Sequence, residues 1–194
     1  GDTVLLTDLL DEAVERAEAE LAKRGGEGSA EERRALAAEI GIGAIKYADL
    51  ANDRIKDYVF DWDRMLVAEG RTGPYLQYAH ARIQSIVRKG AEAGVSLEQG
   101  ATITVVDHAE RKLALELLDS ATAVLEAGDT LRPHHLAGYL HELATAYTVF
   151  YEKCPVLKAP DDATRGSRLA LCDVTARVLS GGLELLGIAA PERM

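Results

Sequence analysis

Apolar side chains recur every three or four residues along most of this 194-residue chain, and glycine or proline separates one such stretch from the next. Because an α-helix turns once every 3.6 residues, this spacing places the apolar side chains of each stretch on one face. The pattern predicts helices over residues 7–24, from a capping box at 29–32 to about residue 40, over 44–50, and over 107–125, 131–151 and 162–186. Another helix is expected to begin at Pro74 and to carry an apolar stripe as far as Val87. The predicted fold class is therefore mainly α.

Three segments interrupt the helical pattern in the first part of the chain. Gly41 and Gly43 predict a break, and the aromatic and β-branched residues 57–61 predict a short strand. Residues 69–74, with two glycines and a proline, predict a turn or compact loop. We place the organisational boundary there, between a small α-rich connecting region with a short strand at 1–74 and a helical bundle at 75–194. A loop is also expected around residues 94–100.

The composition limits the classes of protein to which this chain can belong. Lys and Arg number 22 against 32 Asp and Glu, so the formal net charge is −10, which argues against nucleic-acid binding through overall charge but leaves room for a local basic or aromatic patch. No apolar run reaches the roughly 18–20 residues of a membrane helix, and the first residues show no signal-peptide pattern. Cys154 and Cys172 form no CxxC motif, so we expect two buried thiols. These features predict a cytoplasmic protein without a membrane partner.

Signals of a catalytic or metal site are weak along the whole chain. Of the five histidines, only His134 and His141 share a predicted helix face, and no carboxylate or cysteine supports a metal site there. The serines lie within predicted helices without the elbow motif of a hydrolase, and the glycine pairs fit helix ends better than phosphate loops. The residues themselves therefore indicate no catalytic residue, no metal and no cofactor.

Tyrosines next to an arginine are the most informative polar pattern. Tyr75, Tyr78 and Arg82 fall at i, i+3 and i+7 of one predicted helix and so form one ridge. Tyr147 and Tyr151 repeat an i, i+4 pattern on another helix. Aromatic rings beside a guanidinium can stack unpaired bases and hold phosphate. The alternative is that Tyr75 and Tyr78 are half-buried core residues with hydrated hydroxyls, and the pattern alone does not decide between the two.

Four ordered segments of the sequence resemble the arginyl-tRNA synthetase family. They are YADL at 47–50, DYVFDWDRML at 57–66, EGRTGPYLQYAHAR at 69–82, and a C-terminal segment with LELLGI at 183–188 and PERM at 191–194. Residues 1–12 are also similar to the segment that follows the family's second ATP-binding loop. The likeness covers nearly the whole chain.

This resemblance implies that the chain consists of two regions with different functions. Residues 1–74 would be the tail of a class I catalytic region with its stem-contact fold, and residues 75–194 a DALR-type anticodon-binding helical domain. The family's HIGH and KMSKS-like signatures and its arginine pocket would all precede residue 1. The whole protein would join arginine to its tRNA with ATP and Mg, whereas this chain would bind the anticodon loop, hold no cofactor and catalyse nothing alone. The implied partners are an arginine tRNA and the catalytic half, and neither a membrane nor DNA.

The resemblance also assigns individual residues to tRNA binding. Positions that contact the anticodon loop in this family match Tyr78, Arg82, Tyr151 and Met194. Unpaired bases would stack on tyrosine while arginine holds a phosphate or a base edge. The alternative is a helical protein-interaction module that has lost tRNA binding, which the acidic charge favours.

The loop before the bundle departs from the common EGNTAPY pattern of the family. Arg71 stands for Asn and would add a phosphate contact beside the anticodon, whereas Gly73 stands for Ala and is expected to loosen the loop before Pro74. Tyr75 is a further candidate for tRNA contact. Its alternative role is to pack against Trp62 and orient the helix.

Overall fold

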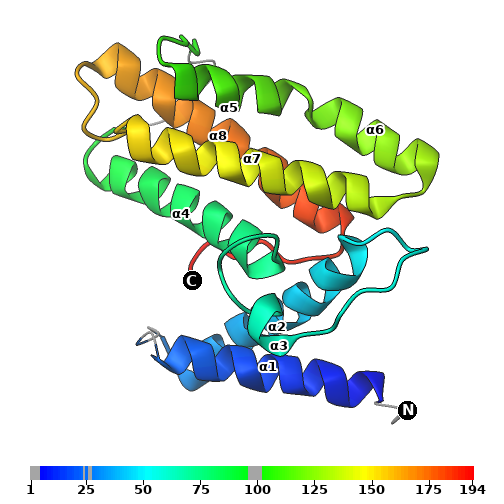
Figure 1. Cartoon of the computed structure of the whole chain (residues 1–194). Coiled ribbons are helices and arrows are strands. Elements are labelled where there is room, and N and C mark those ends of the chain that lie inside the picture. The colour runs from blue at the N-terminus through cyan, green and yellow to red at the C-terminus, as the bar shows by residue number, and fades with distance from the viewer. Residues whose placement is uncertain (1–4, 24, 26–27, 96–101) are drawn as a thin grey trace.

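The computed structural model describes residues 5–23, 25, 28–95 and 102–194. Over these residues the chain forms helices α1 to α8 (Figure 1). Their bounds are α1 Leu6–Lys23, α2 Ala30–Leu50, α3 Trp62–Met65, α4 Gly73–Glu92, α5 His108–Leu118, α6 Ser120–Thr130, α7 Pro133–Lys153 and α8 Asp162–Leu185. The predicted mainly α fold class is thereby confirmed.

The helices form a small layer of α1, α2 and α3 below a bundle of α4 to α8 (Figure 1). In the small layer α1 packs along α2, and α2 in turn contacts α4 and α7. In the bundle α4, α5 and α7 pack against α8, while α6 continues from α5 and lies on α7. The largest fully buried side chains of the bundle core are Leu76, Ile83, Leu113, Leu140, Leu143, Tyr147, Phe150, Leu169, Leu171, Leu179 and Leu183. Helix α2 is therefore the element through which the small layer is joined to the bundle.

The predicted break at the first glycine pair is wrong, because α2 continues through Gly41 and Gly43 to Leu50. A Cβ on Gly41 would lie 2.5 Å from the carbonyl oxygen of Ala13 on α1, and one on Gly43 would lie 2.9 Å from Nε2 of Gln77 on α4. Both glycines thus allow neighbouring helices to approach closely, which a larger residue would prevent. The short helix predicted over 44–50 is the last part of α2.

The strand predicted over residues 57–61 is also wrong, because this segment is irregular. A strand requires a neighbour to satisfy its backbone groups, and the described residues contain no strand that could pair with it. Phe60 instead packs edge-to-face on Trp62, with 4.8 Å between the ring centroids, while Val59 is exposed. The aromatic residues here serve local packing and not a sheet.

Two other predicted boundaries shift in the bundle. The helix predicted over 107–125 is two helices, α5 and α6, which meet at Asp119. The helix predicted from residue 131 begins at Pro133, because Leu131 caps α6 in the left-handed conformation (φ 55°) and Pro133 occupies the first turn of α7. Arg24, the predicted end of the first helix, and residues 96–100 of the predicted loop lie outside the described residues.

The two cysteines are free and buried, as predicted. Burial raises the pKa of the Cys154 thiol to about 11 and that of Cys172 to about 12, so both are held as neutral thiols. None of the described helices has the length and apolarity needed to cross a membrane.

Candidate functional site

Tyr78, Arg82 and Tyr151 come together at the surface where α4 and α7 meet, and we call them the tyrosine–arginine cluster. Tyr78 and Arg82 lie one turn apart on α4, and Tyr151 comes from the last turn of α7. The guanidinium carbon of Arg82 is 4.7 Å from the ring centroid of Tyr78 and 5.0 Å from that of Tyr151. Both distances fall within the range of cation–π attraction. The cluster therefore joins two aromatic rings and one cation from two helices.

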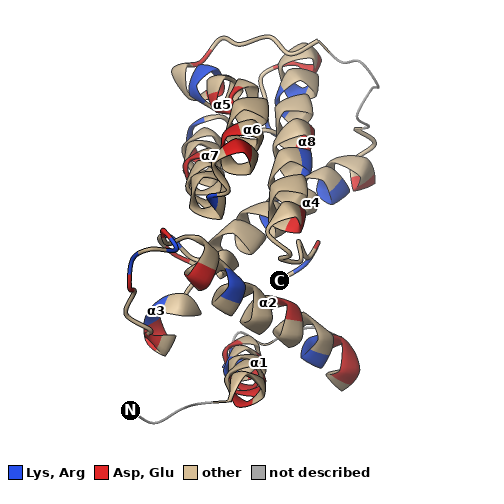
Figure 2. Cartoon of the chain, turned by 90° about the vertical axis from the view of Figure 1, so that its right-hand side faces the viewer, with Lys and Arg blue, Asp and Glu red and all other residues tan. Residues whose placement is uncertain are grey.

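The charge of Arg82 is secured by these neighbours. Burial lowers the pKa of its guanidinium, but the hydrogen bond and negative potential of Tyr78, together with Tyr147 and Tyr151, outweigh burial and raise it. Figure 2 shows acidic and basic residues interspersed over both layers, so this permanent cation lies on a body that is acidic overall. Such a cation is suited to an anionic ligand such as phosphate.

The second tyrosine of the cluster is supported from beneath by the bundle core. Tyr147 is fully buried one turn before Tyr151, and the two ring centroids are 6.3 Å apart. Tyr151 itself leaves 41% of its surface exposed. Because a rigid core residue holds it, Tyr151 presents its ring to solvent in a defined orientation.

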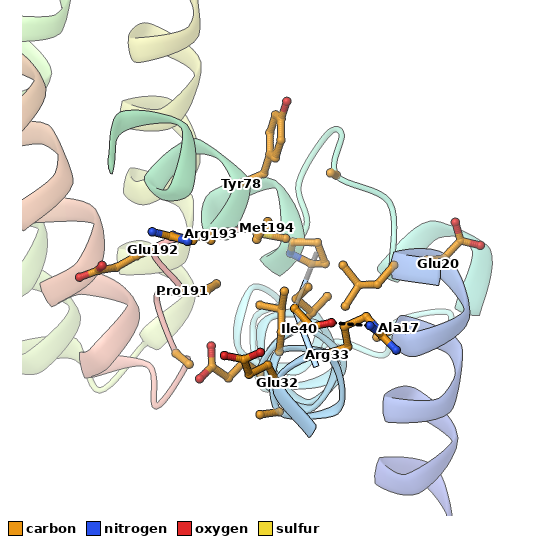
Figure 3. A pocket seen from close by; sticks show the side chains of 18 of the residues that line it. Ala17, Glu20, Glu32, Arg33, Ile40, Tyr78, Pro191, Glu192, Arg193 and Met194 are labelled. Atoms are coloured by element: carbon orange, nitrogen blue, oxygen red, sulfur yellow. Dashed lines mark hydrogen bonds between the residues drawn. The ribbon is translucent and has the colours of Figure 1, made fainter. Parts of the chain in front are cut away.

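Met194, another predicted site residue, lies near the cluster. It is 36% exposed and lines a cleft of about 1100 Å³ together with Tyr78, Pro191 and Arg193. Figure 3 shows Tyr78 on α4 at one side of this cleft and Met194 close to it, with α1 and α2 on the opposite side. The structure thus brings four of the six predicted residues to one region: Tyr78, Arg82, Tyr151 and Met194.

Tyr75 points elsewhere, although it shares the predicted ridge with Tyr78. Its hydroxyl forms a hydrogen bond of 3.2 Å with Oγ1 of Thr148, and its ring lies 5.6 Å from that of His141 on α7. Trp62 belongs to a separate apolar cluster beside α1, where Arg16 lies 5.0 Å over its ring. Tyr75 therefore fixes α4 against α7 and does not pack against Trp62.

Arg71 also turns away from the cluster, toward the first half of α7. Its Nη2 lies 3.3 Å from where a Cβ on Gly138 would be. Burial raises the pKa of Tyr47, and the nearby Arg71 opposes that rise. Arg71 remains exposed, and Gly138, which its side chain approaches, lies more than three helical turns before Tyr151 on α7.

Gly73 does not loosen its loop as expected. It is the first residue of α4, it is buried, and a Cβ there would lie 2.7 Å from the carbonyl oxygen of Gly43 on α2. The preceding Thr72 caps α4 by accepting a hydrogen bond of 3.2 Å from the backbone N–H of Tyr75. The glycine therefore allows α2 and α4 to touch, and the start of α4 is firmly held.

Four polar side chains that the sequence patterns did not single out hold the last residues of the chain. Lys46 on α2 and Gln77, His80 and Arg88 on α4 each donate to a backbone carbonyl between residues 187 and 192. Two of them carry a sequence signal, because Gln77 and His80 are polar residues among the apolar ones of α4, and the structure buries both. Elsewhere in the described residues, no three His, Cys, Asp or Glu side chains are grouped so that they could bind a metal.

Comparison with known families identifies two regions in this chain. Residues 76–194 match the family described as "DALR anticodon binding domain", and residues 1–62 match "tRNA synthetases class I (R), catalytic domain".

Individual relatives cover the chain from end to end. It is 54% identical over 195 residues to the arginine–tRNA ligase of Thermobifida fusca (100% of this chain, 33% of that protein) and 48% identical over 194 residues to that of Haemophilus influenzae (100% and 33%). Among solved structures, Thermus thermophilus arginyl-tRNA synthetase superposes with a TM-score of 0.88 at 39% identity, covering 99% of this chain and 32% of that one. The Plasmodium falciparum arginyl-tRNA synthetase gives 0.82 at 31% identity, covering 98% and 34%. The chain spans about a third of the length of the curated relatives it matches.

Proposed function

Because this chain belongs to the DALR anticodon-binding family and is similar to arginyl-tRNA synthetases over its whole length, we propose that it binds the anticodon loop of an arginine tRNA. The observation that carries the proposal is the tyrosine–arginine cluster, in which Arg82 lies within 5.0 Å of two tyrosine rings. Met194 would form the neighbouring wall of the same surface. Arg71 would contact phosphate beside the anticodon, and Tyr75 would support α4 from behind.

The cluster offers the two kinds of contact that a single-stranded loop requires. A base can stack on the exposed face of Tyr151, and the guanidinium of Arg82 can donate to a phosphate or a base edge. In the free protein Arg82 already lies against both rings, so its donors are held near the surface before RNA arrives. Such preorganisation reduces the entropy lost on binding.

In the whole protein this chain would serve as the RNA-binding part of an arginine–tRNA ligase. The regions preceding it would hold ATP with Mg and arginine and carry out ligation in the cytoplasm. Residues 1–74 would connect that catalytic region to the anticodon-binding bundle at 75–194. The close contact of Gly43 on α2 with Gly73 on α4 supports such a connection. The chain's own residues would bind and orient the tRNA and take no part in bond making.

A second candidate is a protein-interaction module that has lost tRNA binding. Two observations favour it: the net charge of −10, and an apolar groove of about 1030 Å³ between α6, α7 and α8. Helix α6, which lines the groove, has no buried residue of its own. Measurement of RNA binding, described next, distinguishes the two candidates.

The test is titration of the 194-residue chain with an arginine tRNA anticodon stem-loop and with a stem-loop whose central anticodon base is changed. Tyr151→Ala should weaken binding of the first RNA by about 1–3 kcal/mol, the usual value of one stacked base. Arg82→Gln should lower the dependence of log affinity on log salt by about 0.7, the value for one phosphate contact on a single strand. Tyr58→Ala and Arg177→Gln are matched controls, because Tyr58 is similarly exposed at 38% and Arg177 forms an ion pair with Asp173 of the same helix, α8.

The proposal would be contradicted if the site variants bound both RNAs as the controls do. A folded chain that binds neither RNA would favour the interaction module instead.

A further inference from the structure

The last eight residues, 187–194, form an extended segment along α4 that we call the C-terminal strap. After α8, Gly187 turns the chain with a left-handed φ of 68°. The backbone N–H groups of Gly187 and Ile188 still donate to carbonyls of α8, and four strap carbonyls accept hydrogen bonds from side chains of other elements. The donors and acceptors are Lys46 Nζ to Gly187 O, Gln77 Nε2 to Ala189 O (2.9 Å), His80 Nδ1 to Pro191 O (3.0 Å) and Arg88 Nη1 to Glu192 O (3.0 Å).

Gln77 binds the strap and the small layer at the same time. Its Nε2 donates to Ala189 O and, at 3.0 Å, to Glu39 O on α2. The side chain is fully buried, yet its Oε1 has no hydrogen-bond partner in the described part of the chain. A buried acceptor without a partner destabilises a protein. An amide here is therefore explained by the register it sets between α2, α4 and the strap, and not by maximal stability.

His80 binds the strap at Pro191, and its imidazole is present in one tautomer. Because Pro191 O can only accept, Nδ1 carries the proton and donates to it. Nε2 then accepts a hydrogen bond of 3.2 Å from the amide of Gln84. The ring is 4% exposed, so its orientation is set by two partners and by packing.

Apolar contacts also hold part of the strap, since Ile188 belongs to the bundle core and Ala190 packs against it. Ile188 and Pro191 are buried, whereas Ala189, Glu192, Arg193 and Met194 are exposed. Beyond Ile188, three side chains of α4 bind carbonyls of the strap, and that helix also carries Tyr78 and Arg82.

We propose that Gln77 and His80 are positioning residues for RNA discrimination, which act by holding the strap so that Met194 lies beside Tyr78. This inference rests on the proposed function. Neither side chain would touch RNA, since both are buried beneath the strap. We therefore expect their effect on binding to pass through residues 189–194.

The first test needs no RNA. Carboxypeptidase Y should release Met194 and Arg193 slowly from the parent chain and several-fold faster from Gln77→Met and His80→Phe. Each variant removes a hydrogen bond that holds the extended strap, and a chain end that is held less firmly is cleaved more readily. Thr175→Val is the matched control, because Thr175 is equally buried but its hydroxyl donates to Leu171 O within its own helix, α8. The melting temperature of Gln77→Met should change little, because the variant removes the unpartnered Oε1 but also the hydrogen bonds to Glu39 O and Ala189 O. Equal release from all four proteins would overturn the holding role.

The second test is a double-mutant cycle with the chain shortened to end at Ile188. In the full chain, Gln77→Met and His80→Phe should each reduce discrimination between the two stem-loops by about tenfold, a coupling typical of interacting residues. In the shortened chain, which should already discriminate poorly, the same substitutions should have no further effect. Equal losses in both backgrounds would refute positioning through the strap.

The two tests separate the inference from the proposed function. If the parent chain does not discriminate at all, the proposed function fails, and the positioning role fails with it even if the digestion result holds. If the parent discriminates and the cycle shows no coupling, the inference alone fails.

Discussion

Substituting Gly41 by alanine should destabilise the protein, although alanine is the better helix former. Gly41 lies in the interior of α2, where it faces the backbone of α1. An added Cβ would lie 2.5 Å from Ala13 O, 2.6 Å from Ala13 C and 2.9 Å from Val14 N. All three are backbone atoms, so no side chain can rotate aside. Helix α1 would have to move by about 1 Å to restore ordinary contact.

Two opposing contributions set the size of the effect. Replacing glycine by alanine within a helix stabilises it by about 1 kcal/mol. Overpacking costs about 1–3 kcal/mol, and we take the upper value because the obstacle is backbone. The net loss is then about 2 kcal/mol, which for a chain of this size lowers the melting temperature by about 4–8 °C.

Gly181 is the matched control, since it lies within α8 and an added Cβ would meet no atom within 4 Å. Gly181→Ala should therefore show the propensity gain alone, a rise of about 2–4 °C. Thermal unfolding followed by circular dichroism gives both values, and hydrogen exchange should show faster opening of α1 in Gly41→Ala only. The reasoning is refuted if Gly41→Ala raises the melting temperature as much as Gly181→Ala does.

Two further predictions concern buried ionisable groups. Burial raises the pKa of Glu110, but backbone N–H groups before α5 and the Arg168 guanidinium at 2.7 Å outweigh it and lower the pKa. A lowered carboxyl pKa stabilises the fold above the unfolded value, so Glu110→Gln should cost about 2–3 kcal/mol at pH 7, and urea unfolding should show this difference shrinking as the pH falls below about 4. Because their thiols are neutral and buried, Cys154 and Cys172 should resist iodoacetamide in the native protein and react in urea, as mass spectrometry would show; rapid native labelling would contradict this.

The sequence predicts correctly those structural features that are determined by residues within about one turn of each other. The capping box at Ser29 is confirmed, with hydrogen bonds of 3.2 Å from Glu32 N to Ser29 Oγ and 2.7 Å from Ser29 N to Glu32 Oε2. The helical class of the fold follows from 3.6-residue spacing for the same reason. Both signals are complete before any tertiary contact forms.

Predictions from the sequence are wrong where a residue's role depends on a segment that is distant in the sequence. Gly41 and Gly43 look like helix breakers because propensity counts only their own backbone entropy. Their actual neighbours, Ala13 and Gln77, lie tens of residues away in sequence. The segment at 57–61 has strand composition, but no described strand exists to pair with it, and loop packing prevails.

In the candidate site, too, local contacts were predictable from the sequence and contacts between helices were not. Tyr78 and Arg82 were predicted to adjoin each other because they are one turn apart, and they do. The contact of Arg82 with Tyr151 depends on how α4 packs on α7, which helical spacing alone does not specify.

The strap lies furthest from prediction, because its partners on α4 bind backbone carbonyls, a group that every residue carries. No pattern of strap side chains can therefore mark its path. What the sequence does contain is the other half of the interaction: Gln77 and His80, polar residues at i and i+3 among apolar ones on α4. A buried polar group requires a partner, and when the helix itself supplies none, the partner must come from another segment. Polar exceptions on an apolar stripe thus indicate where an irregular segment docks, even though they do not say which one.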